Sequence, residues 1–83
     1  MKIDKIRTAQ ANFLNFQNNL TDTTTSIDGC VKVIMNGKLQ IVSLELNKDV
    51  DNEVVIKTIN EAIAKISHIV QLELMKVQKV MYS

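Results

Sequence analysis

The first twenty residues place apolar side chains at the spacing of an α-helix. Apolar residues recur at steps of three and four, at Ile3, Ile6, Ala9, Phe13, Phe16 and Leu20, and this spacing gathers them on one helix face. Asn18 and Asn19, which are weak helix formers, stand near the expected end. We predict a helix over residues 2–19, with its two phenylalanines in a core or an interface.

The middle of the chain changes to the period of two that is typical of β-strands. In C-V-K-V-I-M-N, one face is fully apolar, with Val31, Val33 and Met35, and the other is mixed, with Lys32, Ile34 and Asn36. The stretch Q-I-V-S-L-E-L has a similar alternating set, at Gln40, Val42, Leu44 and Leu46. Three consecutive threonines precede these stretches, and their β-branched side chains disfavour a helix and suit an edge strand. We predict strands over residues 21–27, 30–36 and 39–46.

Two dipeptides between these strands predict tight hairpins. Asn36-Gly37 is typical of a type I′ turn, which requires a positive φ at both central residues, and Asp28-Gly29 is a second turn signal. The three strands would then form an antiparallel meander. Ile41 and Val42 interrupt the alternation, which indicates either a β-bulge or a strand buried on both faces.

Helical periodicity returns after the strands, without an interrupting glycine or proline, and predicts a helix over residues 51–80. Asp49, Asp51 and Asn52 are candidate N-caps, and acidic residues in a first turn suit the helix dipole. Apolar residues then step by three and four through Ile56, Ile59, Ile63, Ile66, Val70, Leu74, Val77 and Met81. The pattern indicates one continuous apolar face.

This second helix is too long for its predicted neighbours. About 28 helical residues span about 42 Å at 1.5 Å per residue, whereas a five-residue strand spans about 17 Å. The apolar surface beyond His68 therefore needs another partner, which the first helix supplies in part and a second copy of the chain completes. We predict a homodimer with contacts at Ile59, Ile66, Ile69, Val70 and Val77.

Together these elements predict an α+β fold of the order α-β-β-β-α, in one domain over residues 1–83. A chain of this length holds one domain and buries a modest core, so a second copy would add stability. Charged residues interrupt the first apolar stretch, so it does not match a signal peptide. No run approaches the roughly 18 apolar residues of a transmembrane helix. We expect a soluble cytosolic protein without a membrane partner.

The net charge is +1, but the charges are unevenly distributed. Residues 1–20 hold three basic residues and one acidic residue, and residues 74–83 hold two basic residues and no acidic one. The segment between them holds five basic and eight acidic residues. Positive charge is thus concentrated at the two chain ends. This distribution is consistent with a phosphate-binding surface, and equally with ordinary lysines exposed to solvent.

Few residues offer catalytic or metal-binding chemistry. His68 is the only histidine and Cys30 the only cysteine, so no transition-metal site and no disulfide can be assembled within one chain. We interpret Cys30 as a small core residue on a strand, and His68 as a surface or interface residue. Asp49, Asp51 and Glu53 alternate as in a calcium loop, but the required glycine and the twelfth-position acid are missing. We expect no enzyme, no cofactor, no metal and no small-molecule substrate.

Three stretches carry a family resemblance: G-C-V-K-V-I-M-N-G at residues 29–37, I-V-S-L-E-L-N at 41–47 and I-N-E-A-I-A-K-I at 59–66. With their turns and core positions, they resemble the YbaB/EbfC family of small bacterial nucleoid-associated proteins. The resemblance extends over residues 21–83, and the first helix matches only by position and pattern.

The resemblance implies a homodimer with protruding helices that binds double-stranded DNA, largely without base-specific contacts, in the cytoplasmic nucleoid. A dimer would double the basic residues near the chain ends, and phosphates are their natural partners. The candidate DNA-binding residues are Lys2, Lys5, Arg7, Lys76 and Lys79. The alternative function is a protein-protein interaction module that uses the long apolar C-terminal helix and does not bind DNA, which the low net charge favours.

Overall fold

The computed structural model describes residues 2–81. The elements are α1 (Lys2–Asn19), β1 (Thr21–Thr25), β2 (Val31–Asn36), β3 (Ile41–Leu46) and α2 (Asn52–Met81). The predicted α+β class and α-β-β-β-α order are confirmed, and α1 has the predicted bounds. The strands are shorter than predicted because residues at their ends belong to the turns, and α2 lies one residue further along the chain.

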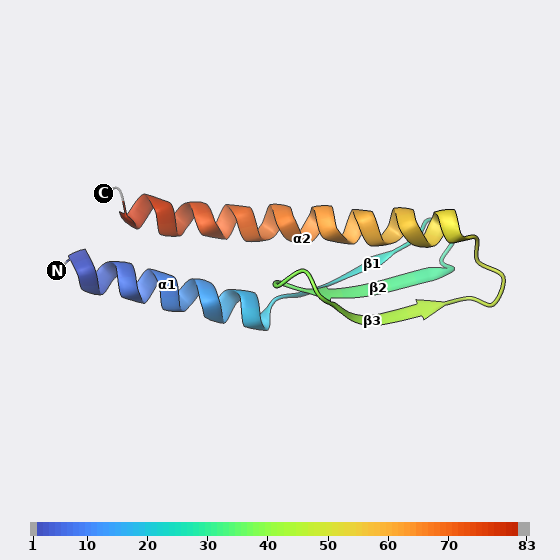
Figure 1. Cartoon of the computed structure of the whole chain (residues 1–83), viewed down its shortest axis with the longest axis horizontal. Helices are drawn as coiled ribbons and strands as arrows, with labels where there is room; N and C mark the ends of the chain where they lie inside the picture. The colour runs from blue at the N-terminus through green and yellow to red at the C-terminus, as the bar shows by residue number, and fades with distance from the viewer. Residues whose placement is uncertain (1, 82–83) are drawn as a thin grey trace.

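The molecule is elongated, and α2 runs along nearly its whole length (Figure 1). The sheet lies beside the first half of α2 and α1 beside its second half, so α1 begins where α2 ends. The Cα atoms extend over 58 × 17 × 14 Å. We call α1 together with residues 67–81 of α2 the arm, because this part extends beyond the sheet.

The core lies between α2 and the central strand of an antiparallel sheet of order β1-β2-β3. Every second residue of β2 is buried, and Val31 and Val33 are wholly inaccessible. They pack with Met35 against Ala62 and Ile66 of α2. The alternation along β2 and the helical period of α2 therefore meet in one apolar layer, as the sequence predicts.

Strand β3 is left uncovered by the helix. Leu46, Leu44 and Ile41 stand directly opposite Val31, Val33 and Met35, so their side chains point to the same face of the sheet as the core. Because α2 packs on β1 and β2 but not on β3, these three side chains stay 49%, 41% and 46% exposed. An apolar strip of sheet therefore remains open beside α2.

A β-bulge interrupts the pairing of β2 with β3. Ile34 pairs with Ser43, but Met35 pairs with Ile41, which leaves Val42 as the extra residue. Of the two alternatives for the adjacent Ile41 and Val42, the bulge is confirmed.

The predicted type I′ turn at Asn36-Gly37 is wrong. The positive φ lies instead at Leu39, at 62°, and the Leu39 amide donates to the carbonyl oxygen of Asn36 at 3.1 Å. The Asn36 side chain accepts hydrogen bonds from the amides of Lys38 and Gln40 at 2.9 and 3.0 Å. The connection is thus a three-residue loop with its left-handed residue last.

Gly37 serves a different purpose from the one its dipeptide predicts. A Cβ at this position would lie 2.6 Å from the carbonyl oxygen of Gln17, and the Gly37 amide donates to the carbonyl oxygen of Leu20 at 3.0 Å. The glycine is required because the turn packs directly on the backbone at the end of α1.

The turn between β1 and β2 contains the predicted Asp28-Gly29, with Gly29 at a φ of 77°. The Ser26 hydroxyl and the Cys30 amide both donate to the Asp28 carboxylate, at 2.6 and 3.0 Å, and these bonds hold the pKa of Asp28 below its usual value. Cys30 lies in this turn, half-buried and before β2 begins. Its interpretation as a core residue on a strand is therefore wrong.

Of the three predicted N-cap candidates, Asp51 is the residue that caps α2. Its carboxylate accepts the Glu53 amide at 3.1 Å, and its carbonyl accepts the Val54 amide at 3.1 Å. These bonds satisfy amide groups that a helix start leaves without partners.

Candidate nucleic-acid interface

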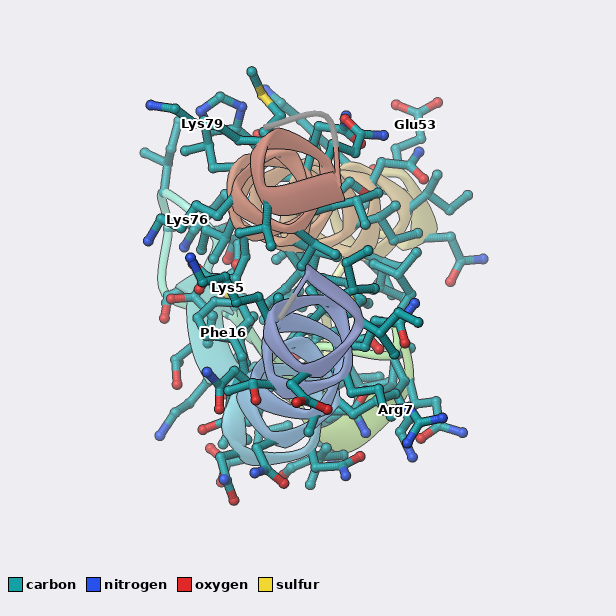
Figure 2. All side chains as sticks on the ribbon, turned by 90° about the vertical axis from the view of Figure 1, so that its left-hand side faces the viewer. Lys5, Arg7, Phe16, Glu53, Lys76 and Lys79 are labelled. Atoms are coloured by element: carbon teal, nitrogen blue, oxygen red, sulfur yellow. The ribbon has the colours of Figure 1, made fainter. Side chains whose placement is uncertain are left out.

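Three predicted DNA-binding residues lie on one side of the arm. Figure 2 looks at the end of the arm and places Lys5 of α1 on the same side as Lys76 and Lys79 of α2. Lys76 and Lys79 are one helical turn apart, and Ala9, one turn after Lys5, lines a shallow hollow together with Lys76. The two helix flanks that carry the lysines therefore adjoin. We call this side of the arm the basic side.

The basic side keeps most of its charge exposed. Lys76 forms an ion pair with Glu73 at 3.1 Å, yet its side chain is 74% exposed. Within residues 2–81, Lys5 and Lys79 form no ion pair with another described residue, and both are exposed. An exposed pair such as Lys76–Glu73 contributes little and separates readily when a phosphate competes.

The other two predicted DNA-binding residues are not part of this cluster. Arg7 points to the opposite side of the arm from Lys5 (Figure 2). It shares its helix flank with Ile3 and Leu14, which precede and follow it by four and seven residues. Lys2 lies in the first turn of α1, and its side chain is outside the described part of the structure.

Lys65, which the sequence analysis missed, shows which flank of α2 faces β1. Its Nζ lies 2.8 Å from the Asp22 carboxylate and donates to the carbonyl of Thr23 and the hydroxyl of Thr24, both at 3.2 Å. This flank of α2 therefore faces β1. Lys76 follows Lys65 by eleven residues, about three helical turns, so it lies on the same flank. The eleven-residue spacing could have shown from the sequence that Lys65 and Lys76 share a helix flank.

The opposite flank of α2 faces β3 and is apolar. Ser67 and Val70 line a hollow with Lys38 and Leu39 of the β2–β3 turn, which identifies this flank. Ile63, seven residues before Val70, is 38% exposed, although it is a large apolar side chain. We call the surface formed by this flank and β3 the open apolar side; it comprises Ile41, Leu44, Leu46, Ile56, Ile59, Ile63 and Val70.

The five predicted dimer contacts fall in different surroundings. Ile59 and Val70 are partly buried and belong to the open apolar side. Ile66 is wholly buried and Val77 is 7% exposed, so both are already covered within one chain. Ile69 is half-buried on the flank of α2 that carries Lys65. Only Ile59 and Val70 therefore offer accessible surface next to the uncovered sheet.

The described residues offer no metal site. Between residues 2 and 81, no three histidine, cysteine, aspartate or glutamate side chains gather closely enough to hold a metal ion. In the same part of the chain, neither helix combines the length and apolarity that crossing a membrane requires.

Comparison with known proteins identifies a family. The sequence model of the YbaB/EbfC DNA-binding family matches residues 2–81, nearly the whole chain. A search of curated proteins found no match to this sequence.

Proposed function

The chain belongs to the YbaB/EbfC DNA-binding family, which groups nucleoid-associated proteins rather than enzymes, and we propose that it acts on double-stranded DNA as a homodimer. Family membership implies work at the nucleoid, in the cytoplasm. The observation that carries the proposal is the gathering of Lys5, Lys76 and Lys79 on one side of the arm (Figure 2). Lys2, at the start of α1, is one turn from this cluster in sequence.

Lysines of this kind contact phosphates without reading bases. The lysine ammonium is a compact charge on a flexible stem, with no fixed geometry for a base edge. Phosphate contacts position a protein on DNA, whereas sequence is read by side chains that enter a groove. The basic side carries charges and no paired recognition group, which supports binding with little base specificity.

The open apolar side supports the homodimer. Its seven side chains expose on the order of 400 Å² of apolar surface, a size at which a surface patch is commonly functional. A standard interface buries roughly 800 Å² on each partner, so the patch by itself supplies about half of that area. Its members are apolar, and the charged side chains of Glu53, Lys57 and Glu61 border it, because they line a hollow together with Ile56.

A gel-shift titration of a DNA duplex at several salt concentrations tests the DNA proposal. We expect the logarithm of the binding constant to fall steeply with the logarithm of salt, with a slope of about −0.9 for each phosphate contacted. Lys76→Gln together with Lys79→Gln should make this slope shallower. The matched control is Lys32→Gln together with Lys48→Gln, which removes two exposed charges outside the arm. The proposal is contradicted if binding at low salt is weaker than micromolar and does not change when Lys76 and Lys79 are replaced.

Sedimentation equilibrium tests the homodimer. We expect about twice the chain mass of 9.4 kDa at micromolar protein. Leu44→Asp should return the mass to that of one chain, because it places a charge in the open apolar side where two copies would bury it. A single-chain mass for the unaltered protein at micromolar concentration refutes the homodimer.

The interaction-module alternative rests on the same open apolar side. It predicts that the protein binds another protein through this surface and leaves DNA unshifted. A partner recovered in one-to-one ratio and no longer recovered with Leu44→Asp, together with a failed gel shift, would establish the alternative over DNA binding.

A further inference from the structure

The dipeptide Asn36-Gly37 can undergo a reaction of its own. The backbone nitrogen of the residue after an asparagine can attack the carbon of the side-chain amide, and a glycine leaves that nitrogen least hindered because it has no Cβ. A bond forms between the Gly37 nitrogen and the Asn36 Cγ, the bond from Cγ to Nδ2 breaks, and ammonia leaves with the proton of the Gly37 amide. Water then opens the cyclic imide to aspartate or isoaspartate, so the net change is from a neutral amide and water to a carboxylate and ammonium.

The fold blocks the attacking nitrogen. The Gly37 amide donates to the carbonyl oxygen of Leu20 at 3.0 Å, and Gly37 is buried. The nitrogen attacks only after it loses its proton, and here that proton is bound to an acceptor and shielded from solvent. The Asn36 side chain is restrained as well, because its oxygen accepts the amides of Lys38 and Gln40 at 2.9 and 3.0 Å and its Nδ2 donates to the Gln40 side chain at 2.9 Å.

The group that blocks this nitrogen belongs to the end of α1, which lies beside the β2–β3 turn (Figure 1). Leu20 follows α1 directly, and its amide still donates to the carbonyl oxygen of Phe16 at 2.9 Å. Gln17 holds the same turn, because its side-chain amide donates to the carbonyl oxygen of Gly37 at 3.3 Å. When the end of α1 moves away from the turn, Gly37 therefore loses both its acceptor and its cover.

We propose that Asn36 is a deamidation site controlled by α1: the site is protected while the end of α1 is docked on the turn and reacts when α1 detaches. Isoaspartate carries the backbone through the former side chain, which adds a methylene between β2 and the turn and displaces the Gly37 nitrogen from the Leu20 carbonyl. A chain that has reacted in this way does not dock α1 as before. The reaction needs neither DNA nor a second copy of the chain, so it is independent of the proposed function.

Incubation of the full chain at mildly alkaline pH tests the proposal, with and without enough guanidinium chloride to unfold the protein. Trypsin cleaves after Lys32 and Lys38 and releases residues 33–38, in which chromatography and mass spectrometry separate the asparagine, aspartate and isoaspartate forms. We expect Asn36 to deamidate at least about tenfold more slowly in the folded chain, because a protected site reacts only during the fraction of time that it is open. Equal rates in the folded and unfolded chains overturn the proposal.

Two variants separate detachment of α1 from unfolding of the whole chain. Phe13→Ala truncates a half-buried side chain of α1 that lines a hollow with Val77 of α2, and Ile59→Ala truncates a partly buried one that packs on the core. Phe13→Ala should accelerate deamidation more than its lowered guanidinium midpoint accounts for, and Ile59→Ala should not. Rates that follow the midpoints alone overturn control by α1. Gln17→Ala, which removes the hydrogen bond to the turn, takes the place of Phe13→Ala if that chain loses its circular-dichroism spectrum.

Hydrogen exchange on the reacted chain tests the consequence for α1. The isoaspartate form should exchange the α1 amides faster than the unreacted chain. Asn36→Asp is the matched control, because it carries the same charge on an unaltered backbone and should keep α1 protected. Equal protection of α1 in the isoaspartate form and the unreacted chain overturns the claim that the reaction undocks α1.

Discussion

Gln17 in α1 and Gly37 in the β2–β3 turn meet backbone to backbone. A Cβ on residue 37 would lie 2.6 Å from the carbonyl oxygen of Gln17 and 2.9 Å from its Cα. The Gln17 side-chain amide also donates to the carbonyl oxygen of Gly37 at 3.3 Å. Since only Leu20 stands between α1 and β1, this contact is where α1 is attached to the sheet.

Gly37→Ala should destabilise the protein by about 1–3 kcal/mol, the range for an added methyl that forces backbone to shift. The cost comes from the clash with Gln17, because Gly37 does not have a positive φ. Thermal unfolding followed by circular dichroism measures it. Gly29→Ala is the matched comparison: residue 29 has a φ of 77° and no atom within 4 Å of the added Cβ, so its cost is conformational, about 1–2 kcal/mol. Only the alanine at position 37 should also loosen α1, seen as faster hydrogen exchange there.

Leu39→Gly should stabilise the protein by about 0.5–1 kcal/mol. Leu39 has a φ of 62°, a conformation that costs an L-residue roughly 1–2 kcal/mol and glycine almost nothing, which outweighs the added freedom of the unfolded chain. The melting temperature should rise by a few degrees. Lys38→Gly, one residue earlier in the same loop and without a positive φ, should lower it. A lower melting temperature for both variants contradicts the assigned strain.

Ile66→Asp should unfold the chain, whereas Ile63→Asp should leave it folded. Ile66 is wholly buried in the core, where an unpaired carboxylate costs several kcal/mol, but Ile63 keeps 38% of its surface exposed. Circular dichroism and sedimentation on both variants distinguish the core from the surface. If the Ile66→Asp chain folds, α2 does not pack on β2 as described.

Arg7→Gln and Lys5→Gln should differ in their effect on DNA binding, although both remove one positive charge from α1. Lys5 lies with Lys76 and Lys79, and Arg7 points to the other side of the arm (Figure 2). Lys5→Gln should therefore reduce the magnitude of the salt slope by about 0.9 for each phosphate that is no longer neutralised, and Arg7→Gln should leave the slope unchanged. Equal reductions would place DNA across the end of the arm rather than along one side.

The helices and strands were predictable from sequence because their periodicities are long and regular. The apolar steps from Ile3 to Leu20 determine α1, and the alternation around Val31 and Val33 determines β2. The turn type was not predictable, because Asn36-Gly37 is a local signal and the actual reason for the glycine is Gln17, twenty residues earlier.

The surfaces were predictable only in part. All the apolar residues of α2 look alike in sequence, but the chain itself covers Ile66 and Val77 and leaves Ile63 exposed. Leu44 and Leu46 alternate like core residues, and their exposure follows from α2 lying over β1 and β2 instead of β3. Likewise, the lysines near the chain ends were recognisable as a group, but the separation of Arg7 from Lys5 depends on their helix flanks.

The elongated shape determines how the protein travels through solution. The radius of gyration of one chain is 16.4 Å, whereas a compact domain of this length has about 12 Å. An elongated particle experiences more friction than a sphere of equal mass, so a single chain passes through a gel-filtration column ahead of its globular standards and imitates a larger species. Retention volume alone could therefore make a monomer look like a dimer. The stoichiometry has to be determined by a method that measures mass.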